Sequence, residues 1–154
     1  MKTIVIAFYK GRGSILDRAI RLWQSIPHRT VGSKYSHCEI VIDETTYSAD
    51  AIKGKVVRTV RTYSSYNWDM IYLDVDDNSA NEMKKFLLSQ VDKPYDFIGI
   101  FTAQILALKF DDQKAWFCSE LCAAALKLCG IDLKHYNSWY NPRRLWDFLS
   151  SRNV

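Results

Sequence analysis

Hydrophobic positions in the first half of the chain alternate with polar ones or form short runs, a pattern typical of β-strands. The pattern predicts one strand near the N-terminus and four more after residue 34, with a hairpin tip at Asp43–Glu44. The predicted strands cover residues 3–9, 35–42, 45–49, 55–62 and 70–75. This part of the chain is therefore expected to form a β-sheet.

Apolar residues at helical spacing predict five helices, most of them in the second half of the chain. The first begins at the N-cap candidate Ser14 and ends near Ile26. The other four cover residues 77–91, 97–108, 118–128 and 142–149. Gly130 is suited to end the fourth, and Asn141–Pro142 is a start signal for the last. A block of strands followed by a block of helices favours an α+β fold, an antiparallel sheet packed against helices.

Length and composition favour one globular domain over residues 1–154. The chain has 48% hydrophobic, 25% charged and 14% aromatic residues, which excludes a disordered protein. It contains no repeat, linker or low-complexity tract. The apolar run after Met1–Lys2 is too short for a signal peptide, and no stretch of roughly 18 apolar residues follows. We therefore expect a cytoplasmic protein without an integral membrane segment.

The net charge of +4 is a mild excess of basic residues. Most are dispersed, apart from the pair Arg143–Arg144 and a stretch that comprises Lys53, Lys55, Arg58 and Arg61. We interpret the stretch as a solvated strand face and the pair as a helix start. Nucleic-acid binding would need a denser basic stripe with interleaved aromatic residues, so no nucleic-acid partner is expected.

The four cysteines are expected to be reduced in such a chain. They are Cys38, Cys118, Cys122 and Cys129, and no pair has the C-x-x-C spacing of structural zinc sites. A zinc site that combines Cys38, Cys118 and Cys122 with His37 is a weak alternative. Residues 37 and 38 would point to opposite faces of a strand. We therefore predict no metal and no cofactor.

The strand over residues 35–42 carries the first candidate chemistry. One predicted face holds Tyr35, His37, Glu39 and Val41, and the other, expected in the core, holds Ser36, Cys38, Ile40 and Ile42. His37 and Glu39 would lie about 6.5–7 Å apart along the strand. A carboxylate near an imidazole raises its basicity and can fix its tautomer. The alternative is a surface face with a partly exposed His–Glu pair.

The segment from Trp116 to Leu126 carries the second group of candidate catalytic residues. Cys118 stands at the expected start of a helix, where unpaired N–H groups and the positive end of the dipole lower a thiol pKa. The same N–H groups could stabilise an oxyanion. The alternative is an inert core cysteine that shares a helical stripe with Cys122, Ala125 and Cys129. A cysteine at a helix start and a histidine on a strand can still meet in space as nucleophile and base.

Together these residues resemble the NlpC-type papain-fold cysteine hydrolases, in their circularly permuted form. Residues 93–97, Lys-Pro-Tyr-Asp-Phe, resemble the Pro-Tyr element of that family, and residues 117–121, Phe-Cys-Ser-Glu-Leu, resemble its nucleophile element. The histidine segment, Ser-His-Cys-Glu at 36–39, comes before both. This order marks the permuted branch, which includes bacterial, phage and poxvirus proteins and the relatives of lecithin:retinol acyltransferase.

The resemblance implies a permuted papain-like fold, with Cys118 as nucleophile at a helix N-terminus, His37 as general base and Tyr95 beside the nucleophile. The family also has a polar residue that orients the histidine. We prefer Glu39 because it shares a face with His37, with Ser48 and Asp50 as alternatives. Three aromatic side chains could line the substrate site: Tyr35, Tyr95 and Trp116.

The expected function is hydrolysis or acyl transfer through a covalent acyl-enzyme. The resemblance implies a peptide, a peptidoglycan-like molecule or a lipid acyl group as substrate. The alternative is a catalytically inactive papain-like binding module, such as a phage protein that acts on a host target. His28 and His135 lie in predicted loops without a partner acid, and we interpret both as structural or solvent-facing.

Overall fold

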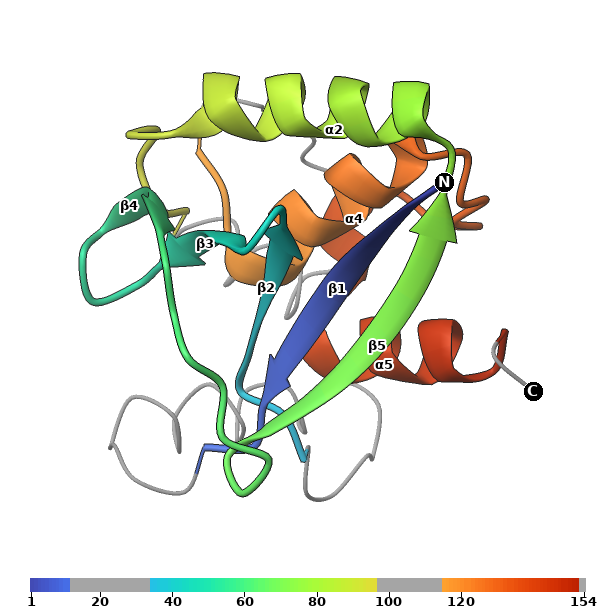
Figure 1. Ribbon diagram of the computed structural model, residues 1–154. Coiled ribbons are helices and arrows are strands. Elements are labelled where there is room, and N and C mark those ends of the chain that lie inside the picture. The colour runs from blue at the N-terminus through green and yellow to red at the C-terminus, as the bar shows by residue number, and fades with distance from the viewer. Residues whose placement is uncertain (12–33, 97–114, 153–154) are drawn as a thin grey trace.

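The computed structural model describes residues 1–11, 34–96 and 115–152. Five strands form one sheet in which every neighbouring pair is antiparallel, in the order β4-β3-β2-β1-β5 (Figure 1). The strands are β1 (Lys2–Tyr9), β2 (His37–Ile42), β3 (Thr45–Asp50), β4 (Lys55–Thr59) and β5 (Trp68–Val75). The prediction of an α+β protein with an antiparallel sheet is confirmed.

Helices follow the sheet in the chain. They are α2 (Asp77–Gln90), α4 (Cys118–Leu128) and α5 (Pro142–Ser150), with a short 3-10 helix, η1 (Asn137–Trp139), before the last. The predicted signals at the ends of α4 and α5 are present: the Asn141 side chain accepts a hydrogen bond from the Arg144 N–H, and Gly130 has φ +72°. The helices predicted over 14–26 and 97–108 fall outside the described residues.

Three predicted strand ends are wrong by two or more residues. β2 begins at His37 rather than at residue 35, β4 ends at Thr59 rather than at residue 62, and β5 begins at Trp68 rather than at residue 70. Residues 60–67, which we call the β4–β5 segment, instead leave the edge of the sheet and run to the start of β5 (Figure 1). The hairpin tip is confirmed, because Asp43 and Glu44 both have positive φ, as a tight two-residue turn requires.

Helix α4 packs against β2 and β3 and so covers the centre of the sheet (Figure 1). Cys38, Ile40 and Ile42 of β2 are buried in the same cluster as Leu121 and Leu126 of α4. The core face predicted for β2 is therefore confirmed at these three positions. Among the helices in the described part of the chain, none is both long and apolar enough to cross a membrane. The packing brings the first turn of α4 to the beginning of β2.

Candidate active site

Cys118 is the first residue of α4. Phe117 is the N-cap in an extended conformation, and its apolar side chain makes no capping hydrogen bond to the backbone N–H groups of the first turn. The turn is tied down by Ser119, whose hydroxyl donates to the Tyr140 carbonyl at 2.6 Å. Cys118 is buried except for a small part of its surface, with 5% exposed. The sulfur is therefore held at a rigid helix start.

His37 is the first residue of β2, and 23% of its side chain is exposed. Its Nε2 lies 2.9 Å from Ser48 Oγ and 3.4 Å from Glu39 Oε2. The described pairing of β2 with β3 ends at Ile40–Tyr47. His37 and Ser48 both lie beyond this last pair, one on each strand. One ring nitrogen of His37 is thus fixed by two side chains of the sheet.

The imidazole of His37 and the sulfur of Cys118 lie close enough together for each to shift the pKa of the other. Burial alone would lower the pKa of His37, but the interactions with Cys118 and Glu39 outweigh it and raise that pKa to about 10. The hydrogen bond from the Cys38 thiol and the charge of His37 hold the pKa of Cys118 well below its usual range, despite burial. The pair is therefore a thiolate beside an imidazolium.

Glu39 completes the arrangement from the same face of β2 and is fully buried. Its Oε1 accepts a hydrogen bond from the Tyr63 hydroxyl at 2.7 Å, and Arg61 Nε lies 3.6 Å from the same atom. Burial opposes ionisation, but the hydrogen bonds from His37 and Tyr63 outweigh it and hold the pKa of Glu39 below its usual value. The carboxylate is thus charged and faces the histidine.

Of the three candidates for orienting His37, the structure brings two to it. Glu39 and Ser48 both lie at Nε2. Asp50 is engaged elsewhere, because its Oδ1 accepts hydrogen bonds from the backbone N–H groups of Ile52 and Lys53 in the turn after β3. Asp50 therefore stabilises a turn.

Tyr95 lies beside the nucleophile. Residues 94–96 run along Trp116, with hydrogen bonds from the Trp116 N–H to the Pro94 carbonyl and from the Asp96 N–H to the Trp116 carbonyl. Burial and then the negative charge of Cys118 raise the pKa of Tyr95. The Pro-Tyr element and the nucleophile element are thus adjacent in space.

Trp116 and Tyr35 do not line this site, contrary to expectation. Trp116 is 1% exposed, and its indole N–H donates to Gln90 Oε1 at 3.0 Å in the core. Tyr35 is fully buried between the rings of Phe8 and Trp146. It lies on the helix face because β2 begins only at His37, so the alternation of faces does not extend back to residue 35.

Sequence reasoning missed three residues that contact the site. Cys38 was expected to be a small hydrophobic core residue, but its thiol also contacts the sulfur of Cys118. Arg61 was assigned to a solvated strand face, and Tyr63 was not singled out. Both lie in the β4–β5 segment, and no local pattern marks them, because only the strand order brings them to Glu39.

A groove of about 630 Å³ lies beside β5, and Trp68 is one of its lining residues. Its lining includes Tyr63, Tyr72 and Trp146 but neither Cys118 nor His37. The ring of Trp68 meets those of His37 and Tyr63 edge-on, with centroids 6.4 and 5.1 Å apart. The groove therefore adjoins the candidate site through the rings of Trp68 and Tyr63, which belong to its lining.

The ring of His135 stacks on that of Trp139 with centroids 4.0 Å apart, and His28 falls outside the described residues. Within residues 1–11, 34–96 and 115–152, no three or more His, Cys, Asp or Glu side chains are arranged to hold a metal ion. Neither a family model nor a curated protein matches the sequence. Cys118, His37 and Glu39 therefore carry the functional information through their geometry.

Proposed function

We propose that this protein is a cysteine hydrolase or acyltransferase of the permuted papain-like, NlpC type. Cys118 is the nucleophile, His37 the general base and acid, and Glu39 the residue that orients His37. The observation that carries this proposal is the position of the His37 imidazole. It lies beside the Cys118 sulfur, and its Nε2 faces the buried carboxylate of Glu39. Perturbed pKa values of this kind are typical of catalytic pairs.

The reaction begins from the thiolate and the imidazolium. Because Nε2 faces Ser48 and Glu39, we assign the contact with Cys118 to Nδ1. The thiolate attacks a carbonyl carbon and forms a C–S bond, while the carbonyl electrons move to the oxygen. When the tetrahedral intermediate collapses, the bond to the leaving amine or alcohol breaks, and His37 gives its proton to that group.

The resulting thioester is resolved in a second half-reaction. Neutral His37 takes a proton from water, or from another acceptor, which attacks the acyl carbon. The C–S bond then breaks, and the thiolate and the imidazolium are restored. In both half-reactions the backbone N–H groups of the first turn of α4 are suited to stabilise the oxyanion. The backbone N–H of Cys38 helps to lower the pKa of Cys118 and so supports the thiolate itself.

The finer fold assignment is part of this proposal. The order along the chain is the histidine strand, then Tyr95, then the nucleophile helix, which is the order of the permuted branch. An antiparallel sheet whose central strand bears His37, packed against the helix of Cys118, is compatible with it. Peptides, peptidoglycan-like molecules and lipid acyl groups are the substrate classes that the resemblance implies.

Thiol labelling tests the proposal without a known substrate. A thiol-reactive acyl probe should label Cys118 rapidly at neutral pH, because the thiolate is the reacting species. Cys118→Ser should abolish this labelling and His37→Ala should slow it strongly. Cys129→Ser is a matched control, since burial raises the pKa of that partly exposed thiol to about 11. Equal labelling of the native protein and both site variants would contradict the proposal and favour an inactive binding module.

A further inference from the structure

Tyr63 lies over the face of the sheet that carries Glu39 and contacts that residue directly. Its hydroxyl lies 2.7 Å from Glu39 Oε1 and 2.7 Å from Thr46 Oγ1, and its ring meets Trp68 edge-on. Thr46 is fully buried, as is Glu39. The Tyr63 hydroxyl therefore joins a strand residue, the acid and the aromatic wall beside His37.

The direction of these hydrogen bonds follows from chemistry. An ionised carboxylate only accepts hydrogen bonds, so the single hydroxyl proton of Tyr63 is directed to Glu39. Thr46 must then be the donor to the Tyr63 oxygen. The result is a directed chain from Thr46 through Tyr63 to Oε1 of Glu39, whose Oε2 faces His37. If the Tyr63 proton were directed to Thr46 instead, Oε1 of the buried Glu39 carboxylate would lose its hydroxyl donor.

The β4–β5 segment reaches Glu39 because of the strand order. β4 and β5 are at opposite edges of the sheet, four strand spacings or about 19 Å apart. Eight extended residues reach at most about 29 Å, so the segment can cross the sheet and still form the turn in which the N–H groups of Asn67 and Trp68 donate to the Ser64 carbonyl. Arg61 of the same segment lies 3.6 Å from Glu39 Oε1 and places its guanidinium over the Trp68 ring.

We propose that Tyr63 is a positioning residue, which keeps Glu39 charged and directed at His37, so that the β4–β5 segment is part of the catalytic machinery. This inference rests on the proposed function. Glu39 is a buried acid, and a buried carboxylate remains ionised only when donors and positive charges compensate for lost water. Its three compensating groups are His37, Tyr63 and Arg61. Two of these belong to the β4–β5 segment.

The test is the pH dependence of Cys118 alkylation by iodoacetamide, which reports the thiolate and needs no substrate. The charged groups that face the Cys118–His37 pair are Glu39 and, through the same network, Arg61, while Cys38 and Tyr95 contribute a thiol and a phenol. Tyr63→Phe removes one hydroxyl and keeps the ring. Without this donor the ionised form of Glu39 is less stable, and its Oε2 is less well directed at His37. The imidazolium is then less stabilised, so the pH midpoint of Cys118 alkylation should rise by about one unit.

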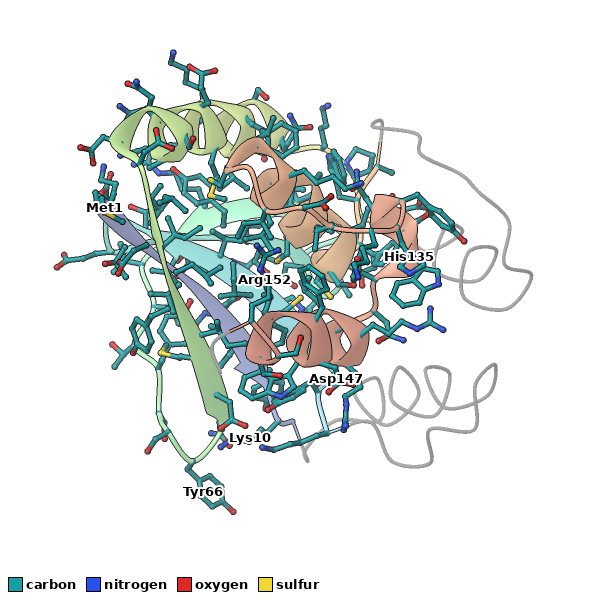
Figure 2. The ribbon with its side chains drawn as sticks, turned by 90° about the vertical axis from the view of Figure 1, so that its right-hand side faces the viewer. Met1, Lys10, Tyr66, His135, Asp147 and Arg152 are labelled. Carbon is teal, nitrogen blue, oxygen red and sulfur yellow. The ribbon has the colours of Figure 1, made fainter. Side chains whose placement is uncertain are left out.

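Tyr66→Phe is the matched control. It makes the same chemical change in the same segment, at a side chain that is 80% exposed and projects away from the sheet (Figure 2). Its alkylation profile should coincide with that of the native protein. A folding defect common to both variants would be visible as a similar loss in thermal stability, whereas only Tyr63→Phe should move the midpoint.

A double-mutant cycle separates an effect through Glu39 from a general loosening of the fold. Glu39→Gln should shift the midpoint upward, and adding Tyr63→Phe to it should cause no further shift. A full second shift in the double variant, or an unchanged midpoint in Tyr63→Phe alone, would overturn the inference. If instead the native protein shows no fast alkylation of Cys118, the proposed function itself fails.

Discussion

At the scale of single residues, the relation between His37 and Glu39 was predictable because it is local. Two positions apart on one strand, their side chains share a face by the geometry of any β-strand, and the structure has their nearest atoms 3.4 Å apart. The contacts of Tyr63, Arg61 and Cys38 were not predictable in this way. They depend on which strands are neighbours and on where the ladder between β2 and β3 ends, and a sequence pattern fixes neither.

The two polar partners of His37 Nε2 should contribute unequally. Ser48→Ala removes a hydrogen bond between the imidazolium and a neutral hydroxyl, worth about 1–1.5 kcal/mol, while Glu39→Gln removes the buried charge that faces the imidazolium, worth about 1.5–3 kcal/mol. With about 1.4 kcal/mol for each pKa unit, the pH midpoint of Cys118 alkylation should rise by about 0.7–1 unit and about 1–2 units, respectively. Iodoacetamide rates over a series of pH values check this. A larger shift in Ser48→Ala would assign the orienting role to Ser48.

The Cys118–His37 pair also predicts a pH profile. The thiolate forms as the pH rises through the lowered pKa of Cys118, and the imidazolium persists until the pH approaches about 10, the raised pKa of His37. Alkylation should therefore be fast well below the usual thiol pKa of about 8.5. In His37→Ala the midpoint should move up towards that ordinary value. Initial rates over this range measure it, and a midpoint shared by both proteins would contradict the ion pair.

At the scale of elements, the sequence predicted types better than ends. The hairpin tip at Asp43–Glu44 and the cap at Asn141–Pro142 are local signals, and both are present. The ends of β2 and β4 depend on pairing with neighbours, so propensity alone extended β2 by two residues and β4 by three. These errors mattered for function, because they assigned Tyr35 to the face of His37 and Arg61 to a solvated strand.

Helix α4 should depend on its anchor at Ser119. This fully buried hydroxyl donates to the Tyr140 carbonyl, and Ser119→Ala would leave that carbonyl without the bond. The expected loss in the free energy of unfolding is about 1–2 kcal/mol, measured by chemical denaturation. Ser151→Ala is the control, since its exposed hydroxyl donates to the Phe148 carbonyl at the end of α5, and the change should alter stability by less than about 0.5 kcal/mol. Equal losses would show that Ser119 is no special anchor.

At the scale of the whole molecule, the antiparallel sheet brings distant parts of the chain to one place. Cys118 comes from α4, His37 and Glu39 from β2, and two partners of Glu39 from the connection between the outermost strands. Burial of a charged group in such an assembly is tolerated only when its partners are already in position. The charge on Glu39 should therefore be linked to folding of the whole chain.

This linkage predicts how stability depends on acid pH. A carboxyl group whose pKa is lower in the folded than in the unfolded protein adds stability above its unfolded pKa, about 4.3 for glutamate. That stability is lost as the pH falls through the lowered value of the folded protein. Native protein should thus exceed Glu39→Gln in the free energy of unfolding by about 2 kcal/mol at neutral pH, and the gap should be constant above about pH 5 and narrow below it.

Chemical denaturation at a series of pH values measures this gap. Glu82→Gln is a suitable control, since Glu82 forms an exposed ion pair with Lys85 on α2, and such pairs add little to stability. Its curve should follow that of the native protein over the whole range. If the gap between native protein and Glu39→Gln remained unchanged far into acid, folding would not lower the pKa of Glu39. The carboxylate would then gain nothing from His37, Tyr63 and Arg61, and the assignment of Glu39 as the orienting acid would fail.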